Sequence, residues 1–232
     1  MRIGILAHSF SSAFELYKAV EEIPGHEVFI ILSPSPHRSA WTSYFANFAR
    51  MVQKSLRSFD RTSLRLSVSQ RLVQLRQPLH HKLSVKTLEK LQLDVGLHKA
   101  GVIYRDVTIN AFRLGILNHH IGILPAYRGR SVMEWSILQG DPVGITVFFI
   151  DTGIDTGSGI LFSEQVDVSG FRTITEAKQY LFNLDRVYFP KALALINDSA
   201  PAFQLSDGSG KRYFVMSKLF EGVAEQLLNA RS

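Results

Sequence analysis

Three polar residues, Asn118, His120 and Asp155, have the types and the spacing to act on a carbonyl group. The side-chain amide of Asn118 can donate a hydrogen bond to a carbonyl oxygen, and the imidazole of His120 can carry a proton near neutral pH. The carboxylate of Asp155 can orient that imidazole. Asn118 and His120 end one apolar run, and Asp155 follows another. We therefore expect a site that holds a carbonyl oxygen and manages a proton.

Strand alternation separates His120 from its neighbour His119. Successive side chains of a strand point to opposite faces, so Asn118 and His120 share a face and His119 points away from them. For the same reason His119 and His120 are poorly placed to bind one metal ion. No acidic or cysteine side chain stands at ligand spacing beside this pair or beside His80-His81. We predict no bound metal.

Apolar and β-branched runs alternate with helix-like stretches, which predicts an α/β fold with a mainly parallel central sheet flanked by helices. Such sheets bind ligands beyond the carboxyl ends of their strands, where Asn118 and His120 are expected. The predicted strands are 2–7, 26–32, 93–97, 114–118, 143–150, 160–166 and 213–215, and the predicted helices are 12–22, 84–91, 131–139, 174–197 and 217–228. We assign residues 1–197 to one main domain and residues 198–232 to a C-terminal appendage packed on it.

The first strand-to-helix turn carries no nucleotide fingerprint. A glycine-rich loop there would let backbone amides bind phosphate, but the chain has His8-Ser9-Phe10-Ser11-Ser12 instead. Hydroxyls in this position favour a cap on the following helix. We expect neither a dinucleotide site nor a P-loop.

Composition limits the classes of function. The chain has 232 residues, of which 46% are hydrophobic, so it can bury a sizeable core. It has no cysteine, which excludes disulfides, thiolate metal sites and a cysteine nucleophile. No apolar run approaches the roughly 20 residues of a membrane span, and the first residues lack a cleavable apolar segment. We expect a cytoplasmic protein without a membrane span.

Positive charge gathers in residues 38–90, which hold eleven Lys or Arg and only two acidic residues, Asp60 and Glu89. Apolar residues interleave with these charges at roughly helical spacing, which predicts a basic helical insert. A solvated helix face is the plain interpretation, and attraction of an anionic small molecule is the alternative. Nucleic acid is not expected as a partner, because no RNA- or DNA-binding motif accompanies the charge.

Five motifs follow one another between residues 118 and 157. They are Asn118-x-His120, Ile123-Leu124-Pro125, Tyr127-Arg128-Gly129, Gly144-Ile145-Thr146 and Asp151-x-Gly153-Ile154-Asp155-Thr156-Gly157. In this order they resemble the formyltransferases that use 10-formyltetrahydrofolate. The resemblance covers residues 93–168 well and the opening β-α-β only by pattern. It implies a Rossmann-like formyltransferase fold.

The resemblance also implies that Asn118, His120 and Asp155 are the catalytic residues of an N-formyltransferase. An amine would attack the formyl carbon, and Asn118 and protonated His120 would stabilise the tetrahedral oxyanion. Asp155 and water would move the proton from the amine to the departing folate nitrogen. The resemblance places the folate beside Ala100, Gly101, Val102, Ile103, Tyr104, Asp151, Gly153 and Ile154.

The acceptor that the resemblance favours is a nucleotide-linked amino sugar. Pro125-x-Tyr127-Arg128-Gly129 and the region of Trp135 resemble enzymes that N-formylate such sugars. Transfer-RNA formyltransferases usually have a further C-terminal domain, for which we expect this chain to be too short. Purine-pathway members usually have a glycine-rich phosphate loop near the first strand, which this chain lacks.

Other functions on the same fold stay open at this point. They are a formyltetrahydrofolate hydrolase, a formyltransferase with another amine acceptor, and a noncatalytic binding module. Formation of a homo-oligomer is also left open. Two positions depart from the family pattern, because His119 stands where an apolar residue is usual and Gly122 where a serine is common. Both departures bear on the wall of the pocket and on folate affinity.

Overall fold

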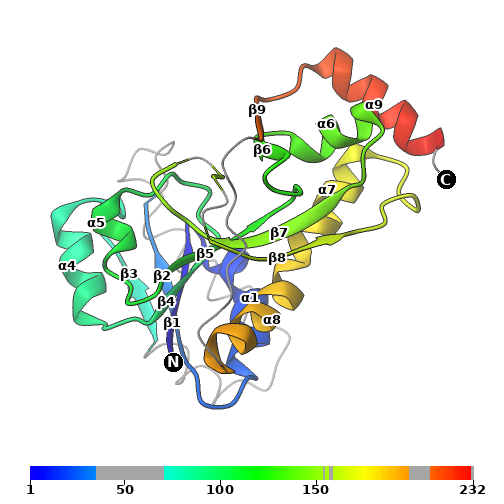
Figure 1. The fold of residues 1–232 in the computed structure, drawn as a ribbon. Helices are drawn as coiled ribbons and strands as arrows, with labels where there is room; N and C mark the ends of the chain where they lie inside the picture. Colours follow the sequence, from blue (N-terminus) through cyan, green and yellow to red (C-terminus); the bar gives the residue numbers. More distant parts are fainter. Residues whose placement is uncertain (35–70, 154, 157–158, 199–209, 231–232) are drawn as a thin grey trace. The chain divides into compact units, whose positions relative to one another are not determined.

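The computed structural model describes residues 1–34, 71–153, 155–156, 159–198 and 210–230, and it confirms the predicted α/β fold (Figure 1). The principal sheet has seven strands, is mainly parallel and is flanked by helices. The chain divides into two compact units, Met1–Ile116 and Leu117–Ser232. The main domain and appendage expected at residues 1–197 and 198–232 stay a prediction.

Four of the described strands form a parallel sheet in the first unit. In spatial order they are β3 (Leu72–Gln74), β2 (Glu27–Leu32), β1 (Arg2–Ala7) and β4 (Val95–His98). Every residue of β1 after Arg2 is buried. A strand that is covered on both faces needs apolar side chains throughout, which explains the continuous apolar run in the sequence.

The described residues of the first unit form three helices, α1 (Phe10–Glu21), α4 (Lys82–Lys90) and the short α5 (Asp106–Ile109). The predicted serine cap on α1 is confirmed, because the side chain of Ser9 accepts a hydrogen bond from the Ser12 N–H at 3.3 Å. The cap satisfies one of the N–H groups that the first turn of a helix leaves without a partner. α1 packs on β1 and β2 through a buried stripe made of Ala13, Leu16, Tyr17 and Val20.

The basic stretch 38–90 is not helical throughout. Residues 38–70 lie outside the described residues, so the helical prediction is not tested there. At Leu72–Gln74 it is wrong, because these residues form β3 and pair with Ile30–Leu32 of β2. A short apolar run fits either a helix or a strand, and pairing with a neighbouring strand decides between them. α4, at the end of the stretch, confirms the helix predicted for 84–91.

Antiparallel strands form the sheet of the second unit. β5 (Gly115–His120) pairs with β7 (Gly144–Phe149), and β7 pairs with β8 (Ile160–Gln165). β5 runs two residues beyond the predicted end at Asn118. Asn118 and His120 are therefore both held in regular strand geometry, which fixes the face on which their side chains stand.

A second sheet has two short parallel strands, β6 (Tyr127–Gly129) and β9 (Lys211–Tyr213). The strand predicted at 213–215 is thus displaced towards the N-terminus, since the backbone pairs with β6 only as far as Tyr213.

α6 (Val132–Gln139) and α9 (Lys218–Ala230) lie side by side (Figure 1). Gly140, with φ +78°, ends α6 as its sequence position predicts.

The single helix predicted for 174–197 is wrong in one respect, because two helices occupy this stretch. α7 (Ile174–Asn183) ends at Leu184, and α8 (Asp185–Asp198) follows at once. The N–H of Leu184 bonds to the carbonyl three residues back, which tightens the last turn of α7. The carbonyl of Leu184 then accepts the first N–H groups of α8, from Val187 and Tyr188.

Asp94, the residue before β4, forms hydrogen bonds with two residues of the first unit, Arg2 and Arg113. Its carboxylate accepts hydrogen bonds from the backbone N–H of Arg2 at 2.7 Å and from the guanidinium of Arg113 at 2.5 Å. Burial alone would raise the pKa of this carboxyl. The Arg2 and Arg113 donors outweigh burial, so the pKa of Asp94 lies below its usual value.

We expect Asp94→Asn to lower the free energy of unfolding at pH 7 by about 1–2 kcal/mol, because the two bonds lose their ionised acceptor. A carboxyl whose pKa is lowered by folding stabilises the fold above its unfolded pKa of about 4, and this contribution disappears as the pH falls through the folded pKa. Urea unfolding should therefore separate wild type from variant at pH 7 and not in strong acid. Glu15→Gln, which removes a carboxylate that is 57% exposed, is the control and should change stability by less than about 0.5 kcal/mol. Equal stability of wild type and Asp94→Asn at pH 7 would contradict the assignment.

Candidate active site

β5 presents Asn118 and His120 on one face, opposite Phe148 and Thr146 of β7 in the strand register. His120 is only 7% exposed, and its ring meets the ring of Phe148 edge-on at a centroid distance of 6.4 Å. The neighbouring His119 packs elsewhere, against the rings of Tyr188 and Phe189 at 5.9 and 6.1 Å. The two histidines therefore have different surroundings, as strand alternation predicts.

Both nitrogens of the His120 ring are directed at protein groups. Nε2 lies 2.8 Å from the backbone carbonyl oxygen of Tyr127. A carbonyl only accepts, so Nε2 carries a hydrogen and donates it. Nδ1 faces the Oδ2 atom of Asp155 at 3.7 Å, which is longer than a hydrogen bond and makes an ion pair when the ring is protonated. The ring is thus anchored at Nε2, and Nδ1 is the edge at which it can act on another molecule.

Asp155 is held by its own backbone conformation and by one backbone donor. Its φ of +46° lies in the left-handed region, which Asp adopts more readily than most residues. The N–H of Gly129 donates to its Oδ2 atom at 3.0 Å. The carboxylate is 15% exposed. The same oxygen therefore meets Gly129 on one side and the His120 ring on the other.

Asp151 orders the loop that leads to Asp155. Its Oδ1 atom accepts a hydrogen bond from the Gly153 N–H at 2.8 Å, and its Oδ2 atom accepts one from the Thr156 hydroxyl. This is the turn for which Asp and Gly are favoured, because the side chain replaces a backbone acceptor. The structure gives Asp151 a role inside the loop, and its predicted contact with folate stays a prediction.

Two functional groups escaped the sequence analysis: the carbonyl of Tyr127 and the N–H of Gly129. They bind His120 and Asp155, respectively, and both belong to β6. Every residue has a carbonyl and nearly every residue an N–H, so residue type carries no signal for either. In the structure Gly129 has a φ of +100°, a backbone conformation that favours glycine.

Gly122 leaves room for the His120 ring because glycine has no side chain. A Cβ atom at this position would lie 2.8 Å from His120 Nε2 and 2.9 Å from the Tyr127 carbonyl oxygen, closer than real Cβ atoms come. The loop beside it is fixed by the buried Thr146 hydroxyl, which donates to the Gly122 carbonyl at 2.8 Å and accepts from the Leu124 N–H at 3.0 Å. The departure from serine at position 122 is thus coupled to the position of the His120 ring.

The residues expected around the folate are divided between the two units. Ala100, Gly101, Val102, Ile103 and Tyr104 follow β4 in the first unit, where the Tyr104 hydroxyl bonds to His98 Nδ1 at 2.8 Å and Ile103 is 71% exposed. Asp151 and Gly153 belong to the second unit, and Ile154 lies outside the described residues. Their role in folate binding stays a prediction.

The described ranges contain no cluster of three or more His, Cys, Asp or Glu that is arranged to hold a metal ion. Within the same ranges, no helix has the length and apolar character needed to cross a membrane.

Residues 76–193 match the sequence model of the formyl transferase family. One curated relative is the methionyl-tRNA formyltransferase of Chlorobium limicola, which is 36% identical over 98 residues. The matched part is 42% of this chain and 30% of that protein. The chain spans less than half the length of the curated relatives it matches first.

Solved structures with the same fold have low sequence identity to this chain. A sugar N-formyltransferase from a Shewanella species aligns with a TM-score of 0.62 at 17% identity, covering 98% of this chain and 87% of that one. The glycinamide ribonucleotide transformylase 1 of Symbiobacterium toebii aligns with a TM-score of 0.61 at 19% identity, covering 89% and 94%. These alignments confirm the predicted Rossmann-like formyltransferase fold.

We expect Gly122→Ser to lower the free energy of unfolding by about 1–3 kcal/mol, because the new side chain forces the His120 ring, the Tyr127 carbonyl or Val132 to shift. Chemical unfolding measures the loss. Gly170→Ala is the matched control, since a Cβ there meets nothing within 4 Å, and it should change stability by less than about 0.5 kcal/mol. A Gly122→Ser variant as stable as the control would contradict this expectation, because it would show that the loop accommodates the side chain without loss of unfolding free energy.

Proposed function

Because this chain belongs to the formyl transferase family, we propose that it transfers a formyl group from 10-formyltetrahydrofolate to a primary amine, with Asn118, His120 and Asp155 as its catalytic residues. The observation that carries the proposal is the buried His120 ring, fixed at Nε2 by the Tyr127 carbonyl and facing the Asp155 carboxylate with Nδ1. A ring fixed in this way has one edge available for chemistry, and that edge lies beside a carboxylate.

The proposed reaction forms one carbon–nitrogen bond and breaks another. The amine of the acceptor attacks the formyl carbon, and the carbonyl oxygen becomes a tetrahedral oxyanion. The side-chain amide of Asn118 and the Nδ1–H of protonated His120 donate hydrogen bonds to this oxyanion, from the face of β5 that they share. Donors held in place by a strand and by the Tyr127 carbonyl need little reorganisation as the negative charge develops.

Proton transfer completes the proposed reaction. The attacking amine becomes an ammonium group and must lose a proton, while the departing folate nitrogen must gain one. Asp155, which the Gly129 N–H holds near Nδ1 of His120, takes the proton from the amine through water and returns it to the leaving nitrogen. The oxyanion collapses, the bond to the folate nitrogen breaks, and the products are a formamide and tetrahydrofolate.

On the family resemblance alone, we propose Ala100, Gly101, Val102, Ile103 and Tyr104 of the first unit as contacts of the formyl donor, and Asp151, Gly153 and Ile154 as further contacts. The exposed side chain of Ile103 offers apolar surface of the kind that a pterin ring can cover. Tyr104 is engaged by His98 and Asp151 by its own loop, so each residue is held in place within its own unit.

For the acceptor we favour the amine of a nucleotide-linked amino sugar. The support is the Pro125-x-Tyr127-Arg128-Gly129 motif together with the shared fold of a sugar N-formyltransferase. A second candidate is the amino group of methionyl-tRNA, which the 36% identity to a methionyl-tRNA formyltransferase favours. The positive net charge of the chain does not favour one acceptor over the other, since both acceptors carry phosphate.

The proposal predicts that formyl transfer to the accepted amine falls by about 100-fold or more in Asn118→Ala and in His120→Ala, because each change removes one of the two donors to the oxyanion. The assay supplies 10-formyltetrahydrofolate with a panel of nucleotide-linked amino sugars and, in parallel, with methionyl-tRNA, and detects the N-formylated product. His119→Phe is the matched control, because it removes the neighbouring imidazole from the opposite face and keeps a ring against Tyr188 and Phe189.

Each outcome of this assay decides between functions. Retained activity in Asn118→Ala or His120→Ala would remove those residues from the mechanism. Product with methionyl-tRNA alone would identify the second candidate acceptor. Release of formate at the full rate without any amine would identify a hydrolase. Binding of the donor without turnover would identify a noncatalytic module.

A further inference from the structure

The two backbone groups that hold His120 and Asp155 belong to β6, and β6 has β9 as its partner strand. Tyr127, Arg128 and Gly129 pair in parallel with Lys211, Arg212 and Tyr213. The contact continues beyond β6, because the N–H of Arg130 donates to the carbonyl of Tyr213 at 3.1 Å. The backbone of β9 therefore helps to set where the Tyr127 carbonyl and the Gly129 N–H lie.

Glycine makes the approach of the two strands unusually close. A Cβ atom on Gly129 would lie 2.2 Å from the carbonyl oxygen of Tyr213, and one on Gly210 would lie 1.3 Å from the carbonyl oxygen of Pro125. No side chain fits at either position without moving a backbone. The distance between the strands is thus defined by direct contact of their backbones.

The side chain of Tyr213 reinforces this contact. Its ring stacks on the ring of Tyr127 with a centroid distance of 5.2 Å and an interplanar angle of 12°, and it meets Trp135 at 5.5 Å. Gln139 bonds to both tyrosine hydroxyls, accepting from Tyr127 at 3.0 Å and donating to Tyr213 at 2.9 Å. Tyr213 is 7% exposed. The residue whose carbonyl binds His120 is therefore packed directly against β9.

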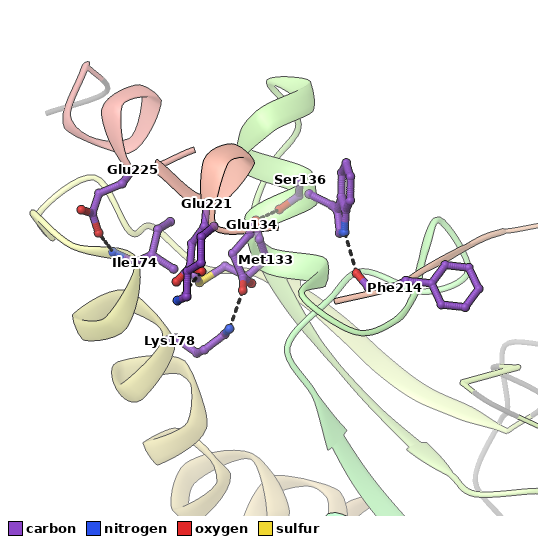
Figure 2. Close-up of polar contacts among 10 residues, drawn as sticks. Met133, Glu134, Ser136, Ile174, Lys178, Phe214, Glu221 and Glu225 are labelled. Atoms are coloured by element: carbon purple, nitrogen blue, oxygen red, sulfur yellow. Dashed lines mark hydrogen bonds and ion pairs between the residues drawn. The ribbon is translucent and has the colours of Figure 1, made fainter. Parts of the chain in front are cut away.

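The segment that follows β9 is also anchored. The Trp135 indole N–H donates to the carbonyl of Phe214 at 2.9 Å, and the N–H of Ile174 donates to Glu225 of α9 at 2.8 Å. Figure 2 shows both bonds, together with the ion pair between the buried Glu134 of α6 and Lys178 of α7. The ring of Phe214 points away from these contacts and is 68% exposed. The chain that follows β9 is thus tied to α6 through Trp135 and to the start of α7 through Ile174.

We propose that β9, through Tyr213, is a positioning element for the catalytic residues. Stacking on Tyr127 and pairing with β6 hold the Tyr127 carbonyl and the Gly129 N–H, which in turn hold His120 Nε2 and Asp155 Oδ2. Tyr213 acts through these groups and does not touch the reacting atoms. The inference rests on the proposed function for its catalytic consequence, whereas the effect on the His120 ring is independent of it.

The test compares Tyr213→Leu, which keeps an apolar side chain but removes the stack, with Tyr213→Phe, which keeps the stack. Phe214→Ala is the matched control, because it removes an aromatic ring from the next residue and leaves its carbonyl in place for Trp135. We expect Tyr213→Leu to lower kcat by about tenfold or more with KM for the amine nearly unchanged, since small displacements of catalytic groups act on the transition state. Tyr213→Phe should restore most of kcat, and Phe214→Ala should leave it unchanged.

Nuclear magnetic resonance of the His120 side chain supplies a readout besides activity. In wild type the Nε2 proton should give a hydrogen-bonded resonance that exchanges slowly with water, because its acceptor is a buried carbonyl. Tyr213→Leu should shift or broaden this resonance, whereas Phe214→Ala should not. Circular dichroism and thermal unfolding establish whether each variant is folded. If Tyr213→Leu does not fold, Tyr213→Phe is compared with wild type in its place.

The outcomes are distinguishable. An unchanged His120 resonance and unchanged kcat in a folded Tyr213→Leu variant would overturn the inference, as would an equal loss of kcat in Phe214→Ala. If wild type formylates none of the amines tested, the proposed function fails, while the His120 resonance still reports whether β9 positions the ring.

Discussion

One hydrogen bond, from the His120 ring to the backbone carbonyl of Tyr127, connects β5 with β6. The bond is buried, so water cannot replace it and its loss would leave a donor without an acceptor. It decides which ring nitrogen is engaged and which one faces Asp155. The arrangement of the site therefore depends on the position of β6, and the position of β6 depends on β9.

The sequence predicts the side chains of this site better than their supports. Period-two alternation placed Asn118 and His120 on one face of β5, because a strand has only two faces. The turn that Asp151 and Gly153 form was not predicted and became evident only from the hydrogen bonds of the Asp151 carboxylate. The Tyr127 carbonyl and the Gly129 N–H could not be identified, because backbone groups have no residue-specific signature.

Long-range pairing accounts for the other differences between sequence and structure. Leu72–Gln74 follow a helix-like pattern locally, yet their pairing with β2 makes them a strand. β6 and β9 are too short to show a period of their own, and the residues that pair between them, such as Tyr127 and Lys211, are 84 apart in the sequence. The close approach of Gly122 to the His120 ring and the Tyr127 carbonyl is likewise visible only in the folded chain.

The parallel pairing of β6 with β9 also orders events during protein synthesis. Translation delivers β5, β6 and the Asp155 loop well before Lys211–Tyr213, and domains fold while the chain is still growing. A nascent chain at that stage already contains Asn118, His120 and Asp155 but lacks the strand that pairs with β6. The pairing that supports the Tyr127 carbonyl and the Gly129 N–H therefore depends on the segment of the site that is synthesised last.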